Sequence, residues 1–276
     1  MDLALEGHEG LMQACVLAAI DLGPSSGRVL RHAAGFARLM SVPLRVLHVN
    51  PEATPEHAER VLEFCMASSP YEVNFTADDI VVRSGLVSEA IHREALRQEA
   101  RLVVIGSRGH GRLSKLLLGS TSDAVLRDAP APVLLVPPND LDIINISDRA
   151  RLTCGPVLAA VDLTENCDHQ LELAGELAHL AGQPLLLLTV APHRVDDHDA
   201  GARLRERAHD AAPLKPRAMI VRHGAIPEEI SRCALTEGSG LVVMGLRPRG
   251  RGRPGAIASA VLKTNRAFIL AVPDSR

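Results

Sequence analysis

Short runs of apolar residues alternate along the chain with longer segments whose apolar positions repeat every three to four residues. The short runs are typical of strands buried on both faces, and the longer segments are typical of amphipathic helices. In the first half the expected strands are Val16–Ile20, Leu44–Val49, Asp79–Arg83, Leu102–Ile105 and Val133–Val136. Helices are expected from about 24 to 40 and over 55–67, 87–99 and 121–128. This alternation predicts an α/β fold with a parallel sheet.

The order of these elements is repeated in the second half of the chain. The matching pairs are Val16–Asp21 with Val157–Asp162, Leu44–Val49 with Leu185–Val190, and Leu102–Gly106 with Leu241–Gly245. The offset is 141 residues at first and 139 later, so the order of the segments is preserved. We therefore expect two copies of one α/β unit, residues 1–148 and 149–276, joined by a polar linker near 139–153.

A glycine-rich stretch follows the strand expected at Leu102–Ile105. Gly106 ends this strand, a loop with Gly109 follows, and Gly119-Ser120-Thr121-Ser122 opens the next helix. Glycine lets a backbone approach a ligand closely, and hydroxyl residues at a helix start leave N–H groups facing an anion. The stretch predicts a phosphate-binding loop, with a glycine-rich surface turn as the alternative. It is not a Walker A loop, because it contains no Gly-Lys-Ser/Thr.

The spacing Gly106-x2-Gly109-x9-Gly119-Ser120 resembles the ATP-binding motif of the universal stress protein family, and the resemblance extends over both halves. It implies two tandem Rossmann-like units of the adenine nucleotide alpha hydrolase-like type, each a five-stranded parallel sheet with helices on both faces. It also implies that the last strands of the units meet across an internal pseudo-dimer interface, like a covalent version of the family's homodimer. Further homodimerisation stays open.

The resemblance also implies which residues form the nucleotide site. Asp21 and the backbone of Val49 are expected at the adenine–ribose end. The phosphates are expected to meet the loop and the helix start, at Gly106, Arg108, Gly109, Gly119, Ser120 and Thr121. The implied ligand is ATP with Mg²⁺, while AMP or a cyclic nucleotide stays open. Asp21 has a second interpretation, as the cap of the turn after its strand, and the Arg108 side chain could equally point to solvent.

The corresponding loop in the second half differs from the first. It is three residues shorter, Ala256 replaces the hydroxyl residue Ser120, and Pro248, which lacks an N–H group, stands at the second glycine. We therefore expect a degenerate site in this half. The loop is also rich in arginine and is expected to be solvated, with an anion or RNA site as the alternative, although no stacking aromatics accompany Arg247, Arg249, Arg251 and Arg253.

Three further patterns suggest chemistry, and each has an ordinary structural interpretation. Gly250-x-Gly252-x-x-Gly255 matches a dinucleotide-binding fingerprint, but no complete dinucleotide fold can follow it. Gly23-x-Ser25-x-Gly27 matches the nucleophile elbow of an esterase, whereas Ser25 or Ser26 as a helix cap is the simpler explanation. A polar segment could ligate a metal but is typical of a solvated loop; its candidate ligands are His193, Asp196, Asp197, His198 and Asp199.

Composition and charge narrow the class of protein. The chain of 276 residues is 46% hydrophobic and has no Trp, so its core must be built mainly from aliphatic side chains. Its formal net charge of −3 argues against binding nucleic acid or an anionic membrane. Its five cysteines are scattered without a CxxC pair, which fits a reducing cytoplasm. No apolar run reaches transmembrane length, and we expect no signal peptide.

The function expected from these observations is that of a stress-response binding or signalling protein. No catalytic base for fast hydrolysis is evident, so we expect at most slow ATPase activity or self-phosphorylation at Thr121 or Ser122. A nucleotide-independent structural or adaptor protein is the alternative, and an esterase using Ser25 is a third hypothesis. Of the nearby histidines, His48 is expected in the core and His110 on the surface.

Overall fold

The computed structural model describes residues 14–51, 53–68, 73–107, 118–138, 141–146, 150–211, 216–246, 255–264 and 267–274. Its strands are β1 (Val16–Ile20), β2 (Leu44–Val49), β3 (Ile80–Arg83), β4 (Leu102–Gly106), β5 (Val133–Val136), β6 (Ile144–Ile146), β7 (Ala150–Leu152), β8 (Val157–Ala160), β9 (Leu185–Ala191), β10 (Ala218–His223), β11 (Leu241–Gly245) and β12 (Phe268–Val272). Its α-helices are α1 (Ser26–Leu39), α2 (Pro55–Ala67), α3 (Val87–Arg97), α4 (Ser120–Arg127), α5 (Asp168–Ala181), α6 (Asp197–Ala211), α7 (Ile226–Glu237) and α8 (Ala256–Thr264). A short 3-10 helix, Ala77–Asp79, precedes β3.

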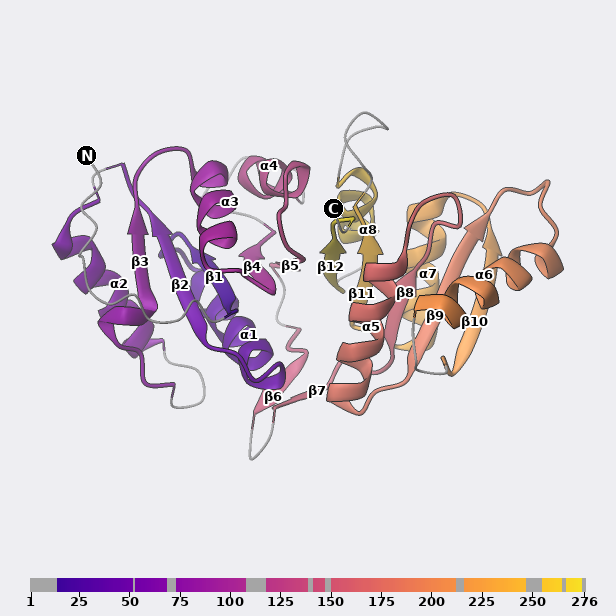
Figure 1. Ribbon diagram of the computed structural model, residues 1–276, viewed down its shortest axis with the longest axis horizontal. Helices are drawn as coiled ribbons and strands as arrows, with labels where there is room; N and C mark the ends of the chain where they lie inside the picture. Colours follow the sequence, from indigo (N-terminus) through magenta and orange to yellow (C-terminus); the bar gives the residue numbers. More distant parts are fainter. Residues whose placement is uncertain are drawn as a thin grey trace.

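Ten strands form one continuous sheet in the order β10-β9-β8-β11-β12-β5-β4-β1-β2-β3 (Figure 1). Within each half the strands are parallel, and the first strand of the half lies between its second and its fourth. The halves join where β12 pairs antiparallel with β5, with Leu270 opposite Leu134. The expected fold class, two Rossmann-like units with a five-stranded parallel sheet in each, is confirmed.

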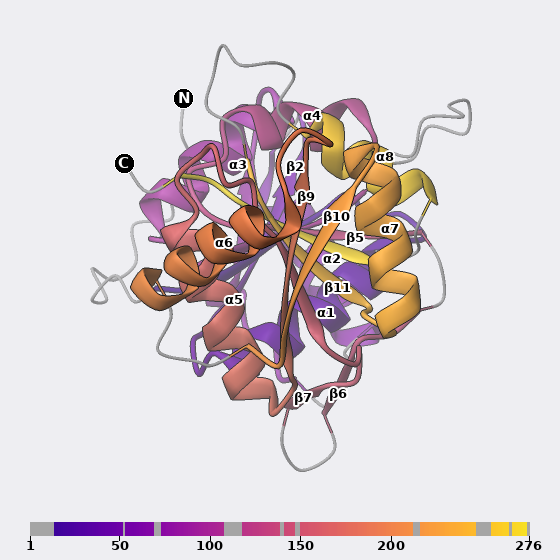
Figure 2. The ribbon, with the colours of Figure 1, turned by 90° about the vertical axis from the view of Figure 1, so that its right-hand side faces the viewer.

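Helices cover both faces of this sheet. The buried apolar residues form two clusters, one containing residues of α1, α2, α5 and α6 and the other containing residues of α3, α4, α7 and α8. Figure 2 shows the arrangement in the second unit, where α5 and α6 lie on one side of the strands and α7 and α8 on the other. Neighbouring strand residues alternate between the clusters, with Val16 and Ala18 in one and Leu17 in the other. Burial on both faces explains the nearly uninterrupted apolar strands.

The linker between the units contains more structure than its polar composition predicts. It forms an antiparallel hairpin of β6 and β7, which contacts α1 and α5. Ile143, Ile144 and Leu152 are at most 2% exposed. Ile144 packs directly over Gly35 of α1, where an added Cβ would lie 2.4 Å from the Ile144 Cδ1. The stretch expected as a polar linker therefore also contains a packed hairpin, because these apolar side chains find a contact surface on the helices.

Side chains also connect the two units across their seam. The His32 ring of α1 lies against Phe268 of β12, with 4.4 Å between ring centroids. Arg101, just before β4, forms an ion pair of 2.8 Å with Glu176 of α5. Gly255, at the start of α8, has a φ of +77°, and a Cβ there would lie 2.8 Å from the Leu126 Cδ1 of α4. Together these contacts tie helices of one half to elements of the other.

Among the described residues no helix has both the length and the hydropathy that crossing a membrane requires.

Candidate functional site

The strand order of the first unit reverses between β1 and β4. β1 pairs with β2 on one side and with β4 on the other. The helix after β1 packs on one face of the sheet, and the helix after β4 packs on the opposite face. The chain thus diverges at the carboxyl ends of these strands and leaves a crevice, which is where open α/β sheets bind ligands. We call this position the first crevice; Asp21 directly follows β1 here, and Gly106 is the last residue of β4.

Asp21 organises the turn that leads from β1 into α1. Its Oδ1 accepts hydrogen bonds from the Gly23 backbone N–H and the Ser26 hydroxyl, both at 2.9 Å. Asp21 is itself exposed, so its carboxylate both shapes the turn and borders the crevice. Ser25 is the N-cap residue of α1, as expected, and its carbonyl accepts from the Arg28 and Val29 N–H groups at 3.1 Å. Ser25 has helical backbone angles and makes no capping hydrogen bond from its side chain, because an N-cap hydroxyl needs an extended backbone to reach the first turn.

The end of β4 and the start of α4 are held together by hydrogen bonds. The Gly119 N–H donates to the Ser107 carbonyl at 2.8 Å, and the Ser122 hydroxyl donates to the Gly106 carbonyl at 2.8 Å. Gly119 is the N-cap of α4, with φ −70° and ψ 157°. Ser120 and Thr121 follow as exposed residues. The first N–H groups of a helix have no partner within the helix, so this start presents backbone donors beside the crevice.

A buried hydroxyl directly follows β4, at the sheet end that borders the first crevice. Ser107 is 1% exposed, and its Oγ has no hydrogen-bond partner among the described residues. Its backbone N–H donates to Val136 of β5, which fixes the residue at the end of the sheet. An unsatisfied buried hydroxyl is costly and therefore calls for an explanation. Within the described part of the chain, this hydroxyl is therefore available as a donor or acceptor at the end of β4.

The remaining residues singled out from the sequence lie either on β2 or outside the described residues. Val49 is half-buried at the end of β2 and lies opposite Arg83 of β3. His48 is 6% exposed, and its Nδ1 lies 2.9 Å from the Ile20 carbonyl, in agreement with its interpretation as a core histidine. Arg108, Gly109 and His110 lie outside the described residues.

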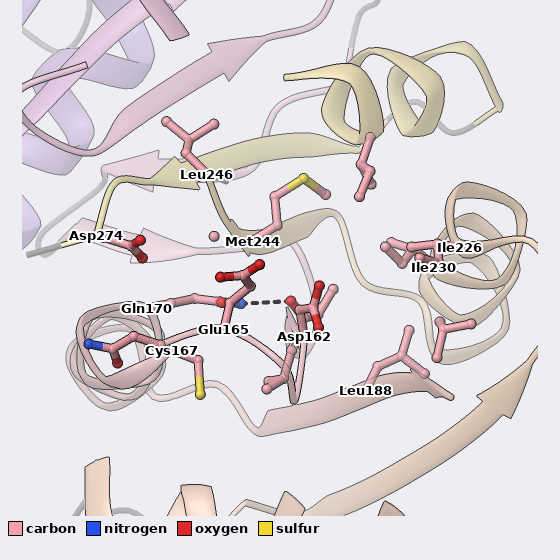
Figure 3. A pocket seen from close by; sticks show the side chains of 16 residues that line it. Asp162, Glu165, Cys167, Gln170, Leu188, Ile226, Ile230, Met244, Leu246 and Asp274 are labelled. Carbon is pink, nitrogen blue, oxygen red and sulfur yellow. Dashed lines mark hydrogen bonds between the residues drawn. The ribbon is translucent and has the colours of Figure 1, made fainter. Parts of the chain in front are cut away.

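The second unit has a crevice at the equivalent position, at the carboxyl ends of β8 and β11, which we call the second crevice. Here the structure contains a cavity of about 100 Å³ (Figure 3). Asp162 borders it and accepts from the Thr164 N–H at 3.0 Å and from the Thr164 hydroxyl at 2.7 Å. Its turn therefore resembles the turn at Asp21. The lining residues are Ala160, Val161, Asp162, Glu165, Asn166, Cys167, Gln170, Leu188, Val190, Ile226, Ile230, Met244, Gly245, Leu246, Ile257 and Asp274.

Sequence reasoning missed this second cavity. It compared only the phosphate-binding positions of the two loops, whereas the cavity is built from every strand end and helix start around the crevice. The signal that could have found it is a set of substitutions between the copies: Ser107 aligns with Leu246, Thr121 with Ile257, Ser122 with Ala258, Pro24 with Glu165, and Pro138 with Asp274. Hydroxyls become apolar side chains, and two prolines become carboxylates.

The structure adds little support for the candidate metal site and the candidate dinucleotide-binding pattern. Within the described residues no three His, Cys, Asp or Glu side chains are arranged to hold a metal ion. His193 instead stacks on His223, with centroids 5.4 Å apart, and the His223 Nε2 lies 2.6 Å from the Asp197 Oδ1. The Gly250-x-Gly252 pattern and the four arginines between 247 and 253 lie outside the described residues.

All five cysteines are buried and free. Burial raises the pKa of the Cys15 thiol to about 11 and the pKa values of Cys65 and Cys154 to about 12. Burial also raises the pKa values of Cys167 and Cys233 above the ordinary value. The reactive form of cysteine is the thiolate, so these side chains are suited to packing rather than to nucleophilic chemistry.

Comparison with known proteins identifies the family. The model described as "Universal stress protein family" matches residues 15–137. A universal stress protein of Thermus aquaticus is 40% identical over 81 residues, covering 29% of this chain and 56% of that protein. Universal stress protein A homolog 1 of Coxiella burnetii is 32% identical over 141 residues, covering 44% of this chain and 94% of that protein.

Two further comparisons concern length and fold. The matches cover about half the length of several curated relatives, namely 56% of the Thermus protein, 53% of one from Mycolicibacterium smegmatis and 44% of one from Mycobacterium bovis. The crystal structure of a universal stress protein from Archaeoglobus fulgidus superimposes with a TM-score of 0.68 at 21% identity, covering 95% of this chain and 98% of that one, which shows the shared fold. The glycine and hydroxyl pattern, the fold and these matches agree: the chain belongs to the universal stress protein family.

Proposed function

We propose that the protein binds an adenine nucleotide, ATP with Mg²⁺, in the first crevice and acts in stress-response binding or signalling. The observation that carries this proposal is the start of α4. Gly119 is held to the end of β4 by its bond to the Ser107 carbonyl, so the exposed first turn with Ser120 and Thr121 borders the crevice. Backbone N–H groups at a helix start, with the positive end of the helix dipole, favour phosphate.

Each residue of the proposed site has a separate part. The Asp21 carboxylate would bind at the adenine–ribose end, beside the backbone of Val49. Gly106, Arg108 and Gly109 would present backbone donors to the phosphates, and Gly119, Ser120 and Thr121 would close around them. The buried Ser107 hydroxyl, which sequence reasoning did not include, fits a polar ligand at the same end of β4. Mg²⁺ is usually held by phosphate oxygens, water and one or two carboxylates, and Asp21 is the described carboxylate in this crevice.

The proposed activity beyond binding is limited to slow ATP hydrolysis or slow self-phosphorylation. Slow self-phosphorylation would fall on Thr121 rather than Ser122, because Thr121 is exposed whereas Ser122 is 4% exposed and its hydroxyl is bonded to Gly106. The five free cysteines support a reducing compartment, and we include the cytoplasm in the proposal on that ground.

The test is nucleotide extraction from purified protein. Acid denaturation followed by anion-exchange chromatography should release about one adenine nucleotide per chain, or direct ATP titration should show one site if the ligand is lost during purification. Ser120→Glu should weaken ATP binding by about a hundredfold, or about 2.7 kcal/mol, because it puts a negative charge at the helix start. Ala256→Glu is the matched control at the equivalent exposed position of α8 and should change ATP binding less than about twofold.

The alternative is a nucleotide-independent adaptor. It would be favoured if neither extraction nor titration detected a nucleotide in the folded wild-type protein. Equal effects of Ser120→Glu and Ala256→Glu would contradict the assignment of the nucleotide to the first crevice.

A further inference from the structure

The cavity of the second crevice has apolar inner walls. Leu188 comes from β9, Met244 from β11 and Ile230 from α7. Leu246, another wall residue, stands where the first unit has the buried hydroxyl of Ser107. Apolar walls that carry only a few polar groups are typical of sites for small molecules with an apolar body.

A buried amide provides one polar group on these walls. Gln170 is 4% exposed, and its Nε2 donates to the Ala160 carbonyl at 2.8 Å and to the Val243 carbonyl at 3.1 Å. These two bonds direct the amide nitrogen to the protein, and no described residue donates to the Oε1. This oxygen lies beside Gly245, 3.2 Å from the place of an added Cβ, and both residues line the cavity. A ligand with an O–H or N–H group would therefore find an acceptor here.

The mouth of the cavity carries charges of both signs. The charged side chains among the described lining residues are Asp162, Glu165 and Asp274. Arg203 of α6 reaches the same turn, where its Nη2 donates to the Leu163 carbonyl at 3.0 Å. Burial raises the pKa of the Cys167 thiol, while the positive charge of Arg207, also on α6, acts to lower it. The mouth therefore gives no basis for preferring a cation or an anion.

The inner walls decide the class of ligand. Beyond the three carboxylates of the mouth, all described lining residues are uncharged, so an ion placed deep in the cavity would lose its water without gaining a charged partner. The cavity volume of about 100 Å³ limits the ligand's size. Since an apolar cavity of about 150 Å³ accommodates benzene, we expect a body of about four to six carbon atoms.

We propose that the second crevice binds a small uncharged molecule that has an apolar body and an O–H or N–H donor. The donor would bond to the Gln170 Oε1, and the apolar body would lie against Leu188, Met244 and Ile230. Figure 3 shows Gln170 on one side of the cavity and Ile230 on the other. This site goes beyond the proposed nucleotide binding, because it uses the other half of the chain and a ligand without phosphate.

The test compares four probes of similar size. Butyl methyl ether is an isomer of 1-pentanol that lacks the O–H donor, and n-pentylammonium and pentanoate replace the hydroxyl by a cation and an anion. Titrations of the full chain are followed by NMR at isotope-labelled methionine methyl groups, where Met244 reports on the cavity and Met40, in the core of the first unit, is the control. We expect 1-pentanol to shift Met244 with a Kd about three- to tenfold below that of the ether and at least about tenfold below those of the two ions.

Two variants test the acceptor. Gln170→Met removes the Oε1 and should bring the Kd values of 1-pentanol and the ether to within about twofold of each other. Gly245→Ala places a methyl group 3.2 Å from the Oε1 and should reduce the same preference. Glu172→Met, at an exposed position of α5, is the control and should keep the wild-type preference. Because both probes are measured on each variant, a general loss of affinity does not change their ratio.

A second pair of variants tests the cavity itself. Ala160→Leu should fill it and abolish the shift of Met244 by 1-pentanol, whereas Ala19→Leu, the matching change at the end of β1, should not. Thermal melts report whether both variants fold, and the Gln170→Met ratio decides the matter if Ala160→Leu does not. The proposal is overturned if 1-pentanol leaves Met244 of the wild type unshifted, if the ether binds equally well, or if either ion binds more tightly.

Discussion

The two crevices of this chain share a backbone design and differ in what lines it. Both lie at the carboxyl ends of the paired first and fourth strands of a unit, where the chain leaves to opposite faces of the sheet, and in both an aspartate organises the turn after the first strand. The first has hydroxyls at the end of β4 and the start of α4, while the second has Leu246, Ile257 and Ala258 there. The second also gains two rim carboxylates. The comparison teaches that a few side chains can change the chemical character of a crevice while the scaffold is kept.

The backbone at the two helix starts differs as well. Gly119 has a φ of −70° and is bonded to the end of β4. Gly255 has a φ of +77° and packs against Leu126 of the other unit. The start of α8 is therefore shaped partly by the seam between the units. One helix start is thus arranged around its own crevice, and the other is arranged partly around the other unit.

The largest expected effect on stability concerns Gln170, which occupies the position of the apolar Val29 in the first unit. Gln170→Met keeps the approximate volume but removes two hydrogen bonds to buried strand carbonyls. We expect the free energy of unfolding to fall by about 1–3 kcal/mol in chemical denaturation. Glu172→Met, at an exposed position of the same helix α5, is the control and should cost less than about 0.5 kcal/mol. An unchanged Gln170→Met protein would show that this amide does not support the second crevice.

Transferring the acidic rim should convert the first crevice toward the second. The double variant Pro24→Glu with Pro138→Asp places carboxylates at the exposed positions equivalent to Glu165 and Asp274. We expect its Kd for ATP to rise about tenfold, or about 1.4 kcal/mol, because the added charges repel phosphate. The difference should shrink at high salt in calorimetric titrations. Unaltered ATP affinity at low salt would mean that these positions do not face the nucleotide.

Ser122 tests the support of the first crevice from within α4. Ser122→Ala removes the hydrogen bond to the Gly106 carbonyl and gives the side chain found in the second unit, at Ala258. We expect a loss of about 1 kcal/mol in the free energy of unfolding, measured by urea denaturation. The reverse change, Ala258→Ser, should produce no comparable gain, since α8 begins with a different backbone conformation. A matching gain would show that the two helix starts are more alike than described.

The smallest expected effect concerns His223, whose equivalent in the first unit is Ser84. Its hydrogen bond with Asp197 raises the pKa of the His223 imidazole above the ordinary value. The pair should therefore stabilise the fold fully below the unfolded pKa of about 6.5, and the contribution should be lost as pH rises through the higher folded value. Titration by NMR should show a lower pKa in Asp197→Asn, and the same pKa in both proteins would contradict this pairing.

Much of the fold was readable from the sequence because periodicity reports burial directly. The strands from Val16 and Leu102 and the helix from Pro55 lie where the apolar pattern places them. The hairpin was missed because its three-residue strands are too short to show a period, and Ile144 is buried only through its fit over Gly35.

The sites were harder to read than the fold. The glycine and hydroxyl motif drew attention to the first crevice because its residues are close in sequence. Ser107 was missed because the lack of a hydrogen-bond partner for its hydroxyl among the described residues is a property of the folded structure. The second cavity collects residues from Ala160 to Asp274, so it becomes visible only when the strands are assembled.

The most direct test of the account is a calorimetric titration of ATP into the full chain, repeated with the Ser120→Glu and Ala256→Glu variants. The account predicts one ATP per wild-type chain, a Kd raised about a hundredfold in Ser120→Glu and a Kd changed less than about twofold in Ala256→Glu. Two ATP per chain, or equal effects of the two variants, would contradict the assignment of the nucleotide to the first crevice.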